Sequence, residues 1–119
     1  MSLVAHLIAA AVMLLHVYIF MLETVLFRSR GYKVFGMTHD KIDVMAPAMS
    51  NQGCYNAFLA AALALGLVLP NAATAQAFTV FGLTCVAVAG VWGAATVSRR
   101  IFFVQTVPAV LGLAALALA

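Results

Sequence analysis

Charged side chains are scarce in this chain of 119 residues, because six Lys or Arg and three Asp or Glu make up only 8% of it. A soluble globular domain carries about 25% charged residues, with which it solvates its surface. Hydrophobic residues make up 66% of the chain. The composition therefore excludes a soluble globule. A net charge of +3 is also too small to follow a phosphate backbone, which excludes nucleic-acid binding.

Cysteine and histidine are also scarce. Cys54 and Cys85 lie in apolar runs without a C-x-x-C pattern, so neither a disulfide framework nor a zinc site is indicated, and we interpret both as small packing residues. The histidines His6, His16 and His39 fall at different depths or in a loop, which leaves too few ligands for a metal or haem. We expect no metal and no cofactor. A Ser-His-acid signature for nucleophilic catalysis is lacking too.

Long apolar runs are the main feature that is present. Residues 44–98 contain no Asp, Glu, Lys or Arg. Since roughly 20 apolar residues cross a bilayer core of about 30 Å, this run holds two spans, divided at the turn pair Pro70-Asn71. Together with the runs at both ends of the chain, it predicts four spans at about 3–27, 47–69, 72–97 and 101–119. The predicted fold is all-α, a single domain of residues 1–119 with four transmembrane helices in an up-down bundle.

The segment 28–46, between the first two spans, mixes apolar and charged residues. It predicts an interfacial segment with a short helix that begins near Thr38 as N-cap, and Pro47 suits the first turn of the second span. The first span lacks a basic leading region, so we expect a retained helix rather than a signal peptide.

The basic residues predict the orientation. They lie only between the first and second spans and between the third and fourth: Arg28, Arg30, Lys33, Lys41, Arg99 and Arg100. In a four-span chain these two loops share one side, which the positive-inside rule assigns to the cytoplasm. We therefore expect a multi-pass protein of the cell inner membrane, in contact with the lipid bilayer, with loops 28–46 and 98–100 cytoplasmic and both termini outside.

Polar side chains inside the spans are the candidate functional residues, because an ionisable group there costs on the order of 3 kcal/mol and normally faces the bundle interior. Counted at about 1.5 Å per residue, they fall at similar depths in the cytoplasmic half. They predict one polar pocket open to the cytoplasm. His16 and Glu23 are its candidate catalytic residues, and the candidate ligand-binding residues are Tyr18, Asn51, Gln52, Tyr55, Asn56 and Gln105.

Each of these residues also has a structural interpretation. The amides can serve as hydrogen-bonding links between helices, each contributing about 0.6–2 kcal/mol. Glu23 can extend to the cytoplasmic interface and meet Arg28 or Arg100. His16 can be a neutral imidazole that hydrogen-bonds an amide.

The third span has no ionisable group. It carries pairs of small residues that are four positions apart, Ala89 with Gly93 and Gly90 with Ala94. This pattern permits close helix approach. It predicts a packing surface, which lies either inside the chain or at the seam of a homodimer through the third span.

Three stretches carry a resemblance to a known family: 16–23, 33–36 and 51–61, of which the last contains the Asn-Gln-Gly-x-Tyr-Asn sequence of Asn51 to Asn56. They resemble a family of bacterial four-span membrane proteins of about this length and of unknown function, whose members are often labelled "epimerase". The resemblance covers nearly the whole chain, including Gln105 and Pro108. It implies a four-helix inner-membrane protein with a polar cluster from the first two spans.

Three functions stay open at this point. The first is a membrane-embedded binding protein or enzyme that holds a small polar or lipid-like ligand and uses His16 and Glu23 as acid and base, as an epimerisation or isomerisation requires. The second is a small proton-coupled transporter, since length, span count and Glu23 resemble the small multidrug resistance transporters. The third is a structural partner of a larger membrane complex. Whether the protein is an enzyme is left undecided by the sequence.

Overall fold

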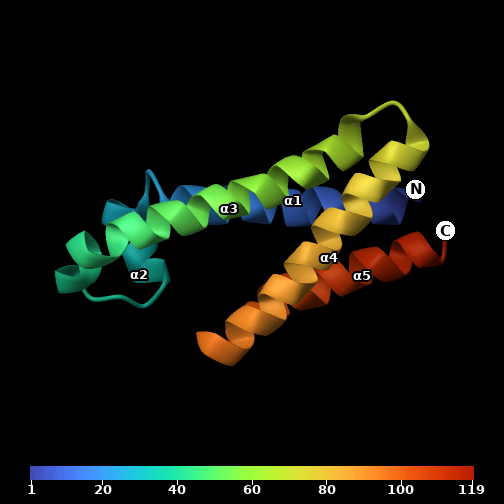
Figure 1. Ribbon diagram of the computed structural model, residues 1–119. Coiled ribbons are helices and arrows are strands. Elements are labelled where there is room, and N and C mark those ends of the chain that lie inside the picture. The colour runs from blue at the N-terminus through green and yellow to red at the C-terminus, as the bar shows by residue number, and fades with distance from the viewer. The chain divides into compact units, whose positions relative to one another are not determined.

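The computed structural model describes residues 1–119 as helices joined by short turns, without a β-strand (Figure 1). The prediction of an all-α fold is confirmed. The five α-helices are α1 (Leu3–Glu23), α2 (Tyr32–Val34), α3 (Ile42–Val68), α4 (Ala72–Thr96) and α5 (Val107–Ala117).

Contacts divide the chain into two compact units. Unit 1 comprises Met1–Met13 with Leu59–Ala119, and unit 2 comprises Leu14–Phe58. Helices α1 and α3 each contribute residues to both units, whereas α4 and α5 belong to unit 1.

Two helices, α1 with 21 residues and α4 with 25, are long and apolar enough to cross a membrane by length and composition. Helix α3 is longer, with 27 residues, but the polar stretch 50–56 interrupts its apolar character. Residues Phe102–Ala117 form a shorter apolar helix. The second and fourth predicted spans are therefore helical, and the count of four transmembrane spans stays a prediction.

Helix α1 ends at Glu23, four residues before the end predicted for the first span. The backbone N–H of Leu26 donates to the carbonyl of Met21, five residues back, and a short π-helix follows at Phe27–Gly31. Gly31 lies against α1 so closely that a Cβ atom there would be 1.8 Å from the carbonyl oxygen of Leu22. The chain thus leaves the α-helix while its side chains are still apolar.

The short helix predicted to begin near Thr38 is observed in part, because Thr38 is the N-cap of a single helical turn that is not separate from α3. Thr38 is extended, its hydroxyl donates to the Asp40 carboxylate, and a single 3₁₀ turn at His39–Lys41 leads directly into α3. Helix α3 therefore begins at Ile42, five residues earlier than predicted, and Pro47 lies inside it rather than in its first turn. Asp43 in the first turn favours this early start, because a carboxylate there complements the helix dipole.

In unit 1 the break predicted at Pro70-Asn71 is observed. The Asn71 side chain caps α4, since its Oδ1 accepts from the backbone N–H of Thr74 at 2.9 Å. The core consists of Ala5, Val12, Leu63, Leu83, Val86, Ala109 and Leu116. The two termini and the turn at 69–71 lie at the same end of this unit (Figure 1).

The small residues of α4 serve packing inside unit 1. A Cβ atom on Gly90 would lie 2.1 Å from Oγ1 of Thr106, and one on Gly93 would lie 2.8 Å from Cγ2 of Ile101. Thr106 also donates to the carbonyl of Ala87 at 2.8 Å. These contacts join α4 to the helical segment that precedes α5. Of the two positions predicted for the small residues of this helix, Gly90 and Gly93 thus occupy the one inside the chain.

Candidate functional site

The central contact of the candidate site joins two buried polar side chains of unit 2. Asn56, on α3, donates from Nδ2 to Oε1 of Glu23, at the last position of α1, over 2.5 Å. Glu23 is 5% exposed and Asn56 is 8% exposed. A buried carboxylate therefore has a hydrogen-bond donor from a second helix, which is what burial of such a group requires.

Gly53 allows this hydrogen bond to form. It lies one turn before Asn56, and a Cβ atom there would be 2.7 Å from Cγ2 of Thr24 and 3.2 Å from Cβ of Glu23. A larger residue would displace Thr24 or move α3 away from the end of α1. Gly53 is not among the site residues predicted from the sequence, although a glycine within a transmembrane helix is a usable signal for close helix approach.

The predicted site residues of α1 and α3 fall into a buried group and an exposed group, according to the face of the helix on which each lies. The buried positions of α3 are Ile42, Gly53, Asn56, Ala60, Leu63 and Gly66, and from Gly53 onward they follow one helical stripe. Asn51, Gln52 and Tyr55 lie off this stripe and are exposed, and so is Tyr18 on α1.

The two remaining candidates lie apart from this contact. His16 is fully buried on α1, seven residues before Glu23, which corresponds to about 10 Å along the helix axis. Gln105 belongs to unit 1 and is half-buried in the π-helical segment Phe102–Thr106. The structure thus places Glu23 and Asn56 in direct contact, with His16 buried on the same helix as Glu23.

The alternative partner Arg28 is engaged elsewhere. Its Nη1 lies 2.5 Å from Oδ1 of Asp43, in an exposed ion pair of the kind that contributes about 0–1 kcal/mol to stability. Glu23 accepts from Asn56 instead. The interpretation of Asn56 as a hydrogen-bonding link between helices therefore agrees with the geometry, and the same contact supplies the polar centre of the candidate site.

A family model described as a protein of unknown function (DUF1304) matches residues 10–117. The chain belongs to this family. All eight predicted site residues lie within the matched DUF1304 region. The family description assigns no activity, and it says nothing about the label "epimerase". No curated protein and no solved structure matches the chain.

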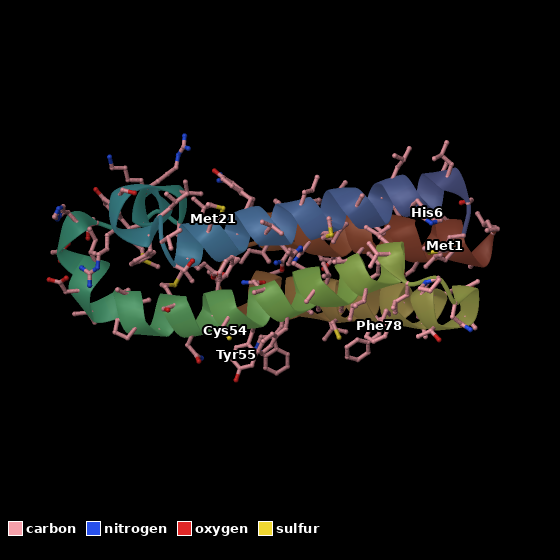
Figure 2. All side chains as sticks on the ribbon, turned by 90° about the horizontal axis from the view of Figure 1, so that it is seen from above. Met1, His6, Met21, Cys54, Tyr55 and Phe78 are labelled. Atoms are coloured by element: carbon pink, nitrogen blue, oxygen red, sulfur yellow. The ribbon has the colours of Figure 1, made fainter.

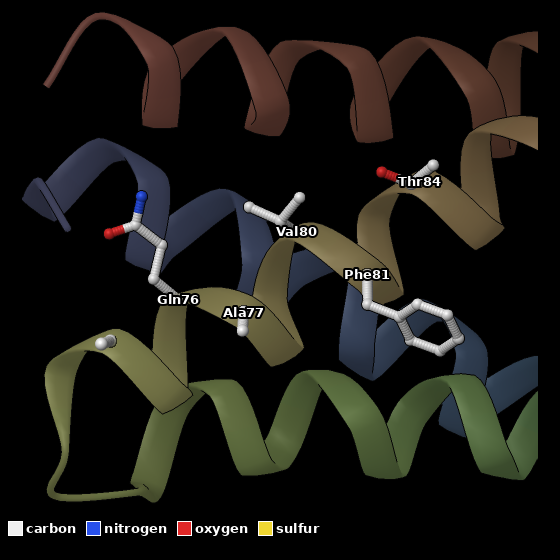
Figure 3. A pocket seen from close by; sticks show the side chains of 6 residues that line it. Gln76, Ala77, Val80, Phe81 and Thr84 are labelled. Atoms are coloured by element: carbon white, nitrogen blue, oxygen red, sulfur yellow. The ribbon is translucent and has the colours of Figure 1, made fainter.

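No three His, Cys, Asp or Glu side chains of this DUF1304 chain are grouped so that they could hold a metal ion. A shallow depression of about 660 Å³ lies along α4 and is lined by Ala73, Gln76, Ala77, Val80, Phe81 and Thr84 (Figure 3). None of the predicted site residues lines this depression. Its wall is mostly apolar, so it lacks the groups that acid-base chemistry needs.

Proposed function

We propose that this protein is a four-span protein of the inner membrane that binds a small polar or lipid-like ligand at a cytoplasm-facing site centred on Glu23. The observation that carries the proposal is the Glu23 carboxylate, buried and hydrogen-bonded by the buried amide of Asn56. Glu23 is one of only three acidic residues in the chain. Burying an ionisable group in a membrane protein costs free energy, and residues for which this cost is met commonly serve a function.

The surface of the helices supports placement in a bilayer. Large apolar side chains are exposed along α1, α3 and α4, among them Leu7, Leu14, Phe58, Val68 and Trp92. Apolar surface of this extent is rare on monomeric soluble proteins, whereas hydrocarbon chains solvate it. The six basic residues, confined to 28–41 and 99–100, support a cytoplasmic position for those segments.

The donors and acceptors at Glu23 indicate the chemical class of the ligand. A carboxylate accepts about four hydrogen bonds, and Asn56 supplies one of them. Ligands that carry hydroxyl or ammonium donors therefore match the site. His16, about 10 Å further along α1, can contact the other end of an extended ligand. Proton removal at one residue and return at the other is the chemistry that an isomerisation needs.

Native mass spectrometry from a mild detergent tests this proposal. Glu23→Gln keeps an oxygen that can accept from Asn56 and removes the negative charge. Asp40→Asn is the matched control, because it neutralises an exposed acid. We expect one bound mass on the wild type and the control that is lost from Glu23→Gln. Identical spectra from all three proteins would contradict the proposal, and a stoichiometric second protein would favour a structural role in a larger complex.

A proton-coupled transporter is the second candidate, because Glu23 is buried whereas the other two acids, Asp40 and Asp43, are exposed. In vesicles with an imposed pH gradient, this function predicts ethidium efflux that is abolished by Glu23→Gln and kept by Asp40→Asn. A bound mass without efflux would favour the ligand-binding function.

A further inference from the structure

One face of α3 within unit 2 is exposed and carries no charged residue from Val44 to Phe58. Its centre consists of five exposed residues, which we call the α3 seam: Val44, Pro47, Asn51, Cys54 and Phe58. Figure 2 shows the neighbouring Cys54 and Tyr55 on the side of α3 that is turned away from α1. The seam therefore lies opposite the stripe of Gly53 and Asn56, and it is separate from the contact of Asn56 with Glu23.

The seam residues lie along a single face of α3, because they follow one another at steps of three and four. Two paired helices contact each other along a face of this kind. A single amide, Asn51, stands among apolar and small residues. In paired helices an isolated Asn at such a position sets the register and the number of helices.

The seam is poorly suited to lipid. In the same unit the exposed face of α1 carries Leu14, Val17 and Met21, whose side chains match hydrocarbon. Asn51 lies 17 residues before the end of α3 at Val68, about 26 Å along the axis, and so falls within a bilayer core of about 30 Å measured from that end. Lipid chains offer its amide no hydrogen bond there, so a hydrogen-bonding partner on another protein surface lowers its free energy.

We propose that the α3 seam pairs with the same seam of a second copy in a parallel two-fold dimer, in which the two Asn51 side chains hydrogen-bond each other. An amide both donates and accepts, so Asn51 is complementary to itself. Residues 44–98 carry no charge, so two identical faces do not repel each other. The uneven distribution of Lys and Arg inserts every copy in the same orientation, so equal residues meet at the symmetry axis.

Tyr55 and Phe58 add an anchor to this surface. Both side chains are 60% exposed, and their rings pack edge to face with centroids 5.9 Å apart. Exposed aromatic pairs of this kind are enriched where protein surfaces meet. They flank Asn51 on the side toward the C-terminal end of α3.

Cys54 provides a native reporter for this arrangement. It occupies a seam position, so a parallel dimer places the two Cys54 residues opposite each other. A disulfide forms when the Cα atoms are roughly 4.4–6.8 Å apart, a separation that closely paired helices reach. The proposed pairing of the two uncharged seams does not require this disulfide, which serves only to report it.

The test uses the full chain in its native membrane. With Cys85→Ser, Cys54 is the single cysteine, and mild oxidation with copper phenanthroline is followed by a non-reducing gel. We expect a covalent dimer. The matched control is Leu14→Cys in a Cys54→Ser, Cys85→Ser background, which places the cysteine on the exposed face of α1 in the same unit. This control should stay monomeric.

Variants of Asn51 test the hydrogen bond. Asn51→Leu should weaken association by about threefold to thirtyfold, measured by fluorescence energy transfer between labelled copies in vesicles, because lipid is as apolar as leucine. Asn51→Gln should restore most of the association. If the helices paired in water, leucine at a seam position would strengthen association instead.

The proposed dimer rests on the membrane placement proposed above, and different experimental results would overturn the dimer and the membrane placement. Absence of the chain from the membrane fraction overturns both. A membrane-inserted chain that stays monomeric, or that cross-links as well through Leu14→Cys as through Cys54, overturns the dimer alone. A different protein bound to the seam in stoichiometric amount also overturns the pairing of two copies.

Discussion

Asn56 is the residue on which the local environment of Glu23 depends. Its Nδ2 supplies the hydrogen bond that a buried carboxyl group needs, and Gly53 brings it within reach. Asn51, on the same helix and of the same type, is exposed and makes no part of this contact. The two asparagines thus have different roles because they lie on different faces of α3.

Asn56→Leu should destabilise the protein by about 1–3 kcal/mol, because the Glu23 carboxyl group stays buried without its donor. Unfolding of the purified protein in mixed detergent, followed by circular dichroism, measures this loss. Gln52→Leu, an exposed amide four residues earlier, serves as the control and should change stability by less than about 0.5 kcal/mol. Equal effects of both variants would show that the buried hydrogen bond contributes nothing specific.

The pairing of α1 with α3 in unit 2 depends on the small size of Gly53. The helix end at Glu23 and the turn that follows leave Thr24 facing this glycine, and the Thr24 hydroxyl donates to the carbonyl of Phe20 at 2.7 Å. A larger side chain at residue 53 would therefore disturb the packing of α1 against α3.

Gly53→Ala should cost about 1–3 kcal/mol of stability, since its methyl group would meet Cγ2 of Thr24 at 2.7 Å. Thr24→Ser removes that methyl group and keeps the hydroxyl, so the double variant should regain part of the loss. The same detergent titration reads both. Additive losses in the double variant would show that the cost arises from helix propensity or another contact.

At the scale of the whole molecule, the testable property is the number of membrane crossings. In a background without cysteines, Ala73→Cys should react with a membrane-impermeant maleimide in intact spheroplasts. Ser29→Cys and Ser98→Cys should react only after lysis, because four spans place both on the cytoplasmic side. All three substituted residues are exposed, so their reactivity reports the side of the membrane. Reaction of Ser98→Cys in intact cells would rule out the predicted topology.

The turn at Pro70-Asn71 was predictable from local chemistry. A proline cannot continue the first helix, and the Asn71 side chain caps the next one. The end of α1 was not predictable in this way. Apolar character continues to Phe27, whereas the α-helix ends at Glu23. It ends there because the backbone turns after Glu23 and Gly31 packs against the backbone of Leu22. Hydropathy reports where a segment can be buried, and it does not report where the backbone changes its hydrogen-bonding pattern.

The amino-acid sequence alone predicts the all-helical class, the polar residues of α1 and of the stretch 50–56 in α3, and the division of basic from apolar segments. These follow from composition and helical period, which act locally. The contact of Asn56 with Glu23 and the exposure of Asn51 and Tyr55 emerge from the packing of α3 against α1. This outcome depends on which stripe of α3 packs against α1, and the close approach at Gly53 sets it, because a helix can bury just one of its faces against a single neighbour.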